Sequence, residues 1–183
     1  MRRGKSIAST RCDHCQQKPV KMKSHTIDRD QMTEPAPHIE IVDGPIDEAS
    51  LRESVSDPDA GSIGWFLGVT RRTTGDRTTS TLWYEAHIPM AKRELEKLAS
   101  EAIKRFQLRK LVIVHRLGEV PIGEASVLVG CCSGHRRETF EALPWIMEKL
   151  KAEIPIWKRE LYSDGSTEWV HPVSSGDRGS ELP

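Results

Sequence analysis

Two helical segments with an apolar stripe, set among short strands, most constrain the fold of this chain. The first, in residues 89–106, has Pro89 suited to its first turn and apolar positions at steps of three and four, namely Ala91, Leu95, Leu98, Ala102 and Phe106. The second, in residues 136–154, has a comparable stripe at Phe140, Leu143, Met147, Leu150 and Ile154. Because such a stripe must be buried against another layer, we expect both helices to cover a sheet. Pro144 falls inside the second segment, so we expect that helix to bend there or to begin later.

Runs rich in β-branched and aromatic residues predict strands around these helices. The predicted strands are HIEIV, GSIGWFLGVTR, the returning strand STLWYEAHI after the loop TTGDRTT, KLVIVHRL, ASVLVGCC, and a final hairpin of IWKRELYS and TEWV. The turn of that hairpin is predicted at Asp164-Gly165, and the glycines of GSIGWFLGVTR indicate close approach of another backbone or side chain. DEASLRESV predicts a short helix. Since strands and helices mix without strict alternation, the predicted fold class is α+β.

The ends of the chain differ from its middle. Residues 1–37 are polar and show no periodicity, which predicts a disordered tail, and Met22 or Met32 is a candidate for the true initiator. Residues 38–172 carry the predicted strands and helices and are expected to form one domain. Residues 173–183 are expected to be a flexible C-terminal tail.

Charge and hydropathy exclude two classes of function. Lys and Arg together number 27, as do Asp and Glu together, so the basic excess typical of a nucleic-acid-binding protein is absent. No apolar run approaches the ~18 residues of a membrane-spanning helix. We therefore expect neither nucleic-acid binding nor membrane insertion, although a local basic pocket remains compatible with zero net charge.

The four cysteines do not form the pattern of a disulfide framework. Cys12 and Cys15 are followed only much later by the adjacent pair Cys131 and Cys132, which favours a reducing cytoplasm. Cys12 and Cys15 have the spacing of half a zinc site, but no second pair matches it. We therefore expect neither a bound metal nor another cofactor.

The segment CCSGHRRETF places three basic residues where the second helix begins. His135, Arg136 and Arg137 follow a strand that ends in small residues. Cations at a helix N-terminus oppose the helix dipole, whereas an anion there is bound by free N–H groups. This grouping therefore favours an anionic partner over three merely solvated side chains.

Cations also surround the corner EIPIWKRE. Lys151 precedes this corner beside the apolar stripe, and Lys158 leads the final hairpin away from it. A lone lysine at either place would be interpreted as a surface residue with its charge in water. Two lysines around one Pro-Ile-Trp corner make a shared pocket plausible, whereas Arg71, at the end of FLGVTR, is weak evidence by itself.

A different interpretation starts from the second cysteine pair. Five residues separate Cys131 from Arg137, as in the C-x5-R loop of cysteine phosphatases, where a thiolate attacks and an arginine binds phosphate. The loop contains one glycine, and no acid is evidently placed to protonate a leaving group. Adjacent cysteines at the end of a strand are more often small core residues, so this hypothesis stays an alternative.

Five stretches together resemble a known family. FLGVTR, YEAHIPMA, HRLGEVPIGEASVLV, SGHRRETFEA and LKAEIPIWKRE occur in the order found in molybdopterin synthase catalytic (large) subunits, and the resemblance runs from about His38 to Val170. It implies an α/β-hammerhead-like domain with an added antiparallel β subdomain. It also implies a sulfurtransferase that converts cyclic pyranopterin monophosphate into molybdopterin. The sulfur comes from the thiocarboxylated C-terminus of a small ubiquitin-like subunit, and large subunits pair as a homodimer within a heterotetramer.

The resemblance also implies which side chains form the substrate site. Matched motif by motif, the site residues are Arg71, His135, Arg136, Met147, Lys151, Lys158, Arg159 and Glu160. Lys151 and Lys158 are the expected catalytic residues, either stabilising developing charge or handling a proton. Family members can carry an arginine shortly after the tryptophan of the last strand, but after Trp169 the next arginine here is Arg178. That departure leaves open whether Arg178 takes its place.

Helix geometry predicts how these residues meet. His135 and Lys151 are sixteen positions apart, so one straight helix would separate them by ~24 Å. We therefore expect His135 and Arg136 to complete the site of a neighbouring subunit. A non-catalytic adaptor that binds a ubiquitin-like tail stays open as a second alternative, and it would not need Lys151.

Overall fold

A computed structural model describes residues 36–170 of the chain. Residues 1–35 of the predicted N-terminal tail, the whole predicted C-terminal tail, the Cys12–Cys15 motif and Arg178 lie outside these residues. The elements run in the order β1 (His38–Val42), α1 (Glu48–Leu51), η2 (Glu53–Val55), β2 (Ser62–Val69), β3 (Thr73–Thr74), β4 (Arg77–Ala86), α2 (Ile88–Phe106), β5 (Lys110–Arg116), β6 (Gly118–Pro121), β7 (Ala125–Ser133), α3 (Arg136–Glu153), β8 (Ile156–Tyr162) and β9 (Thr167–Val170).

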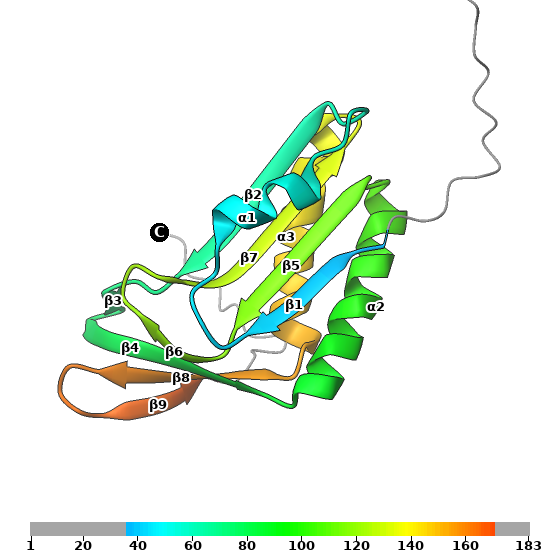
Figure 1. Ribbon diagram of the computed structural model, residues 1–183. Coiled ribbons are helices and arrows are strands. Elements are labelled where there is room, and N and C mark those ends of the chain that lie inside the picture. Colours follow the sequence, from blue (N-terminus) through cyan, green and yellow to red (C-terminus); the bar gives the residue numbers. More distant parts are fainter. Residues whose placement is uncertain (1–35, 171–183) are drawn as a thin grey trace, which may run out of the picture. The chain divides into compact units, whose positions relative to one another are not determined.

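The strands form two sheets, as Figure 1 shows. The first sheet has the order β1-β5-β7-β2, with β1 parallel to β5 and the other neighbours antiparallel. The second is antiparallel, with the order β3-β4-β8-β9, and β6 pairs with β4. The predicted α+β class is therefore confirmed, as a mixed fold with two sheets.

Both faces of the first sheet are covered. Helices α2 and α3 lie on one face, where Leu95, Ile113, Val129 and Ile146 belong to one buried cluster. The short α1–η2 segment covers the other face, over a second cluster that includes Val112. Because β5 and β7 are buried on both faces, their sequences are continuously apolar rather than alternating.

Local signals set the ends of α2. His87 caps its N-terminus, since its Nδ1 accepts a hydrogen bond from the Met90 N–H at 3.3 Å, and Pro89 lies in the first turn as predicted. At the C-terminus Gln107 adopts a left-handed conformation, with φ of 51°, and its N–H bonds to the Ile103 carbonyl. These features confirm the first predicted helix.

The predicted stripe of α3 is wrong at one position. Phe140 is 66% exposed, and the buried positions are Thr139, Ala142, Ile146, Met147 and Leu150. Thr139 and Leu143 approach β2 closely at Gly64, where an added Cβ would lie 2.5 Å from the Thr139 methyl carbon and 2.9 Å from a Leu143 methyl carbon. This close approach turns the bulky Phe140 outward.

The structure decides two further points of local structure. Of the two outcomes expected at Pro144, a later start of the helix is wrong, because α3 runs from Arg136 through Pro144 to Glu153, without the hydrogen bond that a proline cannot donate. Strand β4 does not pair with β2. It joins the second sheet, between β8 and both β3 and β6, and β6 lies where the sequence predicted only a turn. Pairing with strands that come later in the chain is not encoded in the local pattern of β4.

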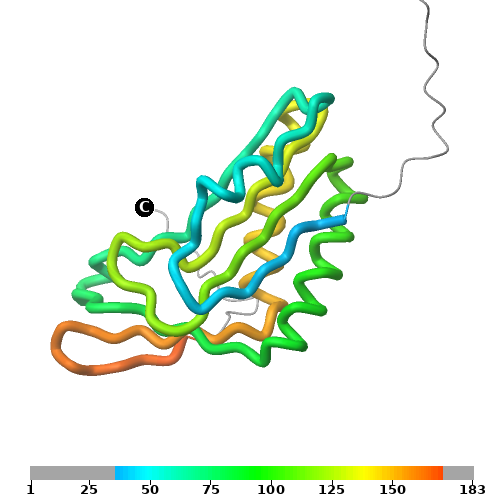
Figure 2. The backbone as a smooth tube through the Cα atoms, in the orientation of Figure 1, coloured from blue at the N-terminus to red at the C-terminus, as the bar shows by residue number. Residues whose placement is uncertain are grey.

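The path of the backbone brings both sheets to the C-terminal end of α3. In Figure 2 the chain leaves α3 and enters β8 directly, beside β4 and below the ends of β5 and β7. Strand β8 pairs with β4 from Ala86–Ile156 to Thr79–Tyr162, and with β9 on its other side. The last turn of α3, the first sheet and the second sheet thus come together at this end of the domain.

Candidate active site

A pocket of about 640 Å³ occupies the space between the two sheets and the end of α3. That volume is typical of a small-molecule site. Its walls come from the end of β2 and the turn after it, from β4, β5, β7 and β8, and from the last turns of α3. The lining includes Phe66, Gly68, Arg71, Thr74, Leu82, Tyr84, His115, Ser126, Met147, Leu150, Lys151, Ile156, Lys158, Glu160 and Val170.

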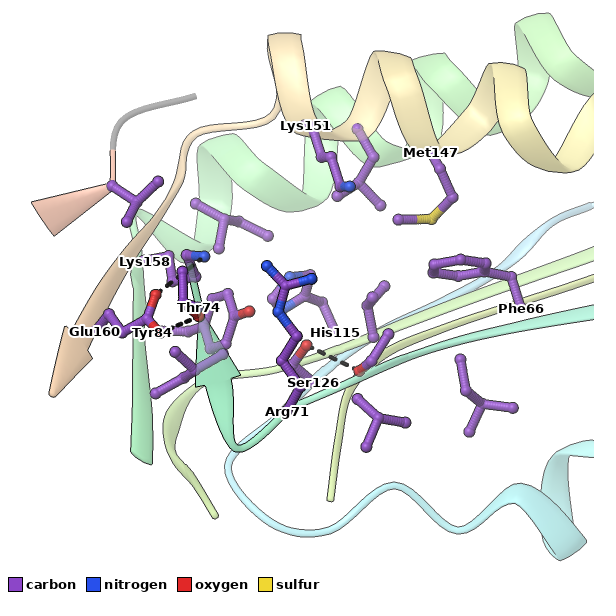
Figure 3. A pocket seen from close by; sticks show the side chains of 18 residues that line it. Phe66, Arg71, Thr74, Tyr84, His115, Ser126, Met147, Lys151, Lys158 and Glu160 are labelled. Carbon is purple, nitrogen blue, oxygen red and sulfur yellow. Dashed lines mark hydrogen bonds and ion pairs between the residues drawn. The ribbon is translucent and has the colours of Figure 1, made fainter. Parts of the chain in front are cut away.

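Charged side chains gather on one side of this pocket. Arg71 and Lys151 are exposed and Lys158 is half-buried. Figure 3 shows Lys158 beside Glu160, Arg71 in the middle of the view, and Lys151 extending from α3. The Lys158 Nζ lies 3.8 Å from one carboxylate oxygen of Glu160. Three cations against one carboxylate leave an excess of positive charge among the lining residues, so this side of the pocket suits an anionic ligand.

Glu160 is the buried anion of the site, with only 1% of the residue exposed. Its Oε1 accepts hydrogen bonds from the Thr74 hydroxyl, at 2.6 Å, and from the Thr79 hydroxyl. Burial by itself would raise the pKa of Glu160, but the two hydroxyl groups and the charges of Lys158 and Arg71 outweigh it and lower that pKa below its ordinary value. The carboxylate therefore stays ionised although it is buried.

Neutral polar side chains lie in the middle of the pocket. The His115 Nδ1 lies 2.9 Å from the Arg116 carbonyl, which can only accept, so Nδ1 carries the proton. Burial lowers the pKa of His115 to about 4, so the imidazole is neutral at physiological pH. Tyr84 packs edge-on against it, with ring centroids 5.1 Å apart, and burial raises the pKa of its phenol. Ser126 donates to the Gly68 carbonyl at 3.1 Å.

The predicted site residues divide into two groups. The pocket brings together Arg71, Met147, Lys151, Lys158 and Glu160, although Arg71 and Lys158 are far apart in the sequence. His135 and Arg136 do not line it, because His135 caps the opposite end of α3 from Lys151 and Arg136 begins that helix. The five basic groups thus do not converge within one chain.

Arg159 also lies outside the pocket. Successive side chains of a strand point to opposite faces, so Arg159 points away from the side that Lys158 and Glu160 share. Its guanidinium carbon lies 5.7 Å from the Trp83 ring centroid and 5.3 Å from that of Trp169. The expectation that Arg159 contacts substrate therefore finds no support in the geometry of this chain.

The cysteine phosphatase hypothesis does not fit the structure. Cys131 is fully buried, and burial raises the pKa of its thiol to about 12, so the nucleophilic thiolate is not available. Arg137 is exposed and forms an ion pair with Glu141 at 2.8 Å instead of facing the cysteine. Cys131 instead belongs to the core between the first sheet and the helices.

Sequence reasoning missed the uncharged part of the site. Thr74, Tyr84, His115 and Ser126 line the pocket, and Thr79 hydrogen-bonds Glu160 from beneath it. A signal was present for His115, which interrupts an apolar run that is otherwise buried. The threonines gave no such signal, because threonine is common on the strands of ordinary sheets.

The part of the chain that the structure describes contains neither a cluster of metal ligands nor a helix suited to cross a membrane. Among residues 36–170, no three side chains of the His, Cys, Asp or Glu type gather as ligands for a metal ion. None of the helices in that range is both long enough and apolar enough to cross a bilayer.

Fold and pocket together define a class: a mixed α+β protein with a cationic small-molecule site at the end of a helix. Comparison with known proteins identifies the family. The family model described as MoaE protein matches residues 41–153, so the chain belongs to the MoaE family. A molybdopterin synthase catalytic subunit from Emericella nidulans is 39% identical over 132 residues, covering 72% of this chain and 68% of that relative.

Solved structures agree with this assignment. Molybdopterin synthase from Staphylococcus aureus matches with a TM-score of 0.68 and 34% identity, covering 72% of this chain and 95% of that chain. A complex of subunits 1 and 2 of molybdopterin-converting factor from Helicobacter pylori matches with a TM-score of 0.59, over 79% of this chain and 94% of that one. At 24% identity, this second likeness supports the fold alone.

Family membership confirms the function expected from the resemblance. The function is that of a molybdopterin synthase catalytic subunit, a sulfurtransferase of molybdenum-cofactor biosynthesis. The chain is therefore an enzyme subunit, and the hypothesis of a non-catalytic adaptor is set aside.

Proposed function

We propose that the pocket binds cyclic pyranopterin monophosphate and that sulfur from a thiocarboxylate is transferred to it there, to form the dithiolene of molybdopterin. One observation carries this proposal: Arg71, Lys151 and Lys158 come from three separate elements and line one pocket. A phosphorylated heterocycle needs cations for its phosphate and neutral surface for its ring. The charged side of the pocket and its neutral middle supply both.

Each cation has a different task in this proposal. Arg71 is exposed at the pocket and can bind a phosphate through two N–H groups at once. Lys151 stabilises the negative charge that develops when the sulfur attacks, because an ammonium group aimed at developing charge lowers the barrier. Lys158, held near Glu160, draws the anionic tail of the sulfur donor into the pocket. Met147 lines the apolar wall beside Lys151.

The sulfur donor is proposed to be a small ubiquitin-like subunit whose thiocarboxylated C-terminal glycine enters the pocket. The family assignment supports this partner, and the related Helicobacter pylori protein was solved as a complex of subunits 1 and 2. We further propose that the complex is located in the cytoplasm. The fold is proposed to be α/β-hammerhead-like with an added antiparallel β subdomain, and the domain to comprise residues 38–172.

A homodimer within a heterotetramer is proposed to complete the site. His135 and Arg136 are exposed at the far end of α3 from Lys151. One turn further along the helix, Phe140 exposes a large apolar side chain, which is the kind of group that protein interfaces bury. A second copy that covers Phe140 would bring His135 and Arg136 beside the pocket of its partner.

Reconstitution with one variant tests the catalytic assignment. Purified protein, thiocarboxylated small subunit and cyclic pyranopterin monophosphate are combined, and dithiolene product is measured. Lys151→Ala is expected to abolish most of the product. Lys149→Ala is the matched control. Lys149 lies two residues before Lys151 on the same helix, but it forms an ion pair with Glu153 and does not line the pocket. Full activity of Lys151→Ala would refute the assignment.

Mixing two inactive variants tests the shared site. Arg136→Ala and Lys151→Ala subunits are expected to be weakly active alone. If each site takes Arg136 from one subunit and Lys151 from the other, random mixed dimers regain about a quarter of the wild-type activity. No recovery on mixing, with dimer exchange verified, would show that each chain builds its own site.

A further inference from the structure

A network of hydroxyl groups connects the two segments that carry Arg71 and Lys158. Thr74 lies three residues after Arg71, and both side chains line the pocket. The Thr74 hydroxyl donates to Oε1 of Glu160 at 2.6 Å, and the Thr79 hydroxyl donates to the same oxygen. The other oxygen of Glu160 faces the Lys158 Nζ at 3.8 Å. One buried carboxylate therefore bridges the β3–β4 hairpin and strand β8.

Backbone hydrogen bonds hold the residues on both sides of Arg71. The Thr70 N–H donates to the Glu124 carbonyl at 3.0 Å, and the Arg72 carbonyl accepts from the Thr79 N–H at 2.8 Å. Thr79 thus contacts the Arg71 segment through its backbone and Glu160 through its side chain. Arg71 itself is exposed, so its position depends on these neighbours rather than on packing of its own side chain.

This network matters more than a single hydrogen bond at the surface would. The free energy lost when a carboxylate is removed from water must be offset by hydrogen bonds or by a nearby cation. Glu160 is among the largest fully buried side chains of the described chain. Its hydroxyl donors both come from one hairpin, and its cationic neighbour lies two residues away on its own strand. Removing a donor would leave an oxygen of Glu160 short of a partner and free to turn toward Lys158.

We propose that Thr74 and Thr79 are positioning residues, which act through Glu160 to hold Arg71 and Lys158 at a fixed separation across the pocket. This inference rests on the proposed function, in which both cations contact the substrate or its sulfur donor. Without the Thr74 hydroxyl, Oε1 of Glu160 keeps only the Thr79 donor, the tie between the Arg71 segment and β8 is weakened, and Lys158 is drawn toward the carboxylate. The consequence is weaker binding of the anionic substrate, whereas Lys151, on α3, remains in place.

Steady-state kinetics of the reconstituted enzyme tests this inference. Thr74→Val keeps the shape of the side chain but removes the hydroxyl, and is expected to raise the KM for cyclic pyranopterin monophosphate about tenfold. The kcat is expected to change by less than about threefold, since the chemical step is left intact. Thr74→Ser restores the hydroxyl and is expected to restore most of the affinity.

Thr78→Val is the matched control. Thr78 is an exposed β4 residue of the same hairpin, next to Thr79, and does not line the pocket. It is expected to keep both KM and kcat. An unchanged KM in Thr74→Val, an equal rise in Thr78→Val, or failure of Thr74→Ser to rescue would each overturn the inference. Thermal unfolding of every variant is measured alongside, and Thr79→Ser against Thr79→Val repeats the comparison if Thr74→Val does not fold.

Two further variants separate failure of this inference from failure of the proposed function. Arg71→Ala and Lys158→Ala remove the cations themselves. If both keep wild-type kinetics, the proposed roles of the cations are wrong and the inference falls with them. If both lose activity while Thr74→Val and Thr79→Val keep the wild-type KM, only the positioning role is wrong.

Discussion

Strand β8 presents two very different faces of the second sheet. The side chains of Lys158 and Glu160 face the pocket, and those of Trp157 and Arg159 face the other side. Four successive residues thus divide into a ligand-facing pair and an outward-facing pair. Because successive side chains of a strand point to opposite faces of the sheet, Lys158 and Arg159 lie in different environments although they are adjacent in the sequence.

The two faces also stabilise charge by different means. On the pocket face, Glu160 is buried, receives two hydroxyl donors and has Lys158 near it. On the outer face, the Arg159 guanidinium lies against the rings of Trp83 and Trp169, and its buried Nε has no hydrogen-bond partner among residues 36–170. Stacking on indole rings holds Arg159 in place but leaves it remote from the pocket. The comparison shows that Lys158 lines the pocket, as its proposed role in the reaction requires, whereas Arg159 packs against the outer face of the sheet.

Replacing one residue on each face by alanine gives the strongest test of the difference between the two faces. Lys158→Ala is expected to lower the rate of dithiolene formation roughly 1,000-fold, or about 4 kcal/mol, because a cation aimed at a charged ligand is lost. Arg159→Ala is expected to leave that rate nearly unchanged. The rates are measured with thiocarboxylated small subunit below saturation, so that weaker capture of its tail lowers the rate. A comparable loss in both variants would contradict the division into two faces.

The lowered pKa of His115, which is buried on the pocket side, predicts how the stability of the protein depends on pH. Its pKa is lowered from 6.5 to about 4 by burial, so between these values the unfolded chain binds a proton that the folded chain does not. The free energy of unfolding should therefore be highest above pH 6.5 and fall by about 3 kcal/mol as the pH drops toward 4. Urea unfolding of the wild type and His115→Phe across this range measures the effect. An equally steep decline in the variant would assign the pH dependence to other groups.

Glu160 gives a smaller effect in a more acidic range. Since its pKa is lowered in the folded protein, its contribution is present above the ordinary value of 4.5 and is lost as the pH falls through the folded value. Glu160→Gln is expected to reduce the free energy of unfolding by about 2 kcal/mol at pH 7. That difference should shrink progressively below pH 4.5 in denaturant titrations. A difference that stays constant with pH would mean that the lost charge is not the cause.

The smallest effect is expected on the outer face. Trp169→Ala removes one of the two rings that stack on Arg159 and should lower the free energy of unfolding by about 1 kcal/mol. Trp169→Phe keeps an aromatic face and should lose less. Both variants are expected to retain the wild-type KM, measured as above. A large rise in KM for either would show that the outer face also takes part in substrate binding.

The contrast between α2 and α3 shows how far the local pattern reaches. The apolar spacing of α2, with Pro89 at its start, was sufficient to predict that helix. The spacing of α3 predicted the helix but placed Phe140 in the core, because the choice among adjacent stripes depends on where β2 allows close approach. At Gly64 the absence of a Cβ allows that close approach. The sequence around this glycine does not indicate which helix will pack against it.

The residues of the pocket also show which features the local sequence pattern could predict and which it could not. The motifs around Arg71, Lys151 and Lys158 were recognisable in the sequence, and the structure places all three side chains on one pocket. Thr74 and Thr79 were not recognised, since their role exists only after β8 brings Glu160 beside the β3–β4 hairpin. Arg159 was predicted with the pocket residues but does not line the pocket of this chain, because the face of β8 that turns inward depends on its pairing with β4.

The sequence by itself determined most of the segments that become strands and helices, the turn at Asp164 and Gly165, and the residue types available to an anion site. These features follow from periodicity and turn chemistry, which act over a few neighbouring residues. The tertiary structure alone decided that Arg71 and Lys158 line one pocket, that Glu160 contacts Thr74, and that Arg159 turns away from them. Such contacts join residues more than 80 positions apart, and they depend on strand pairing and register, which no local stretch of sequence encodes.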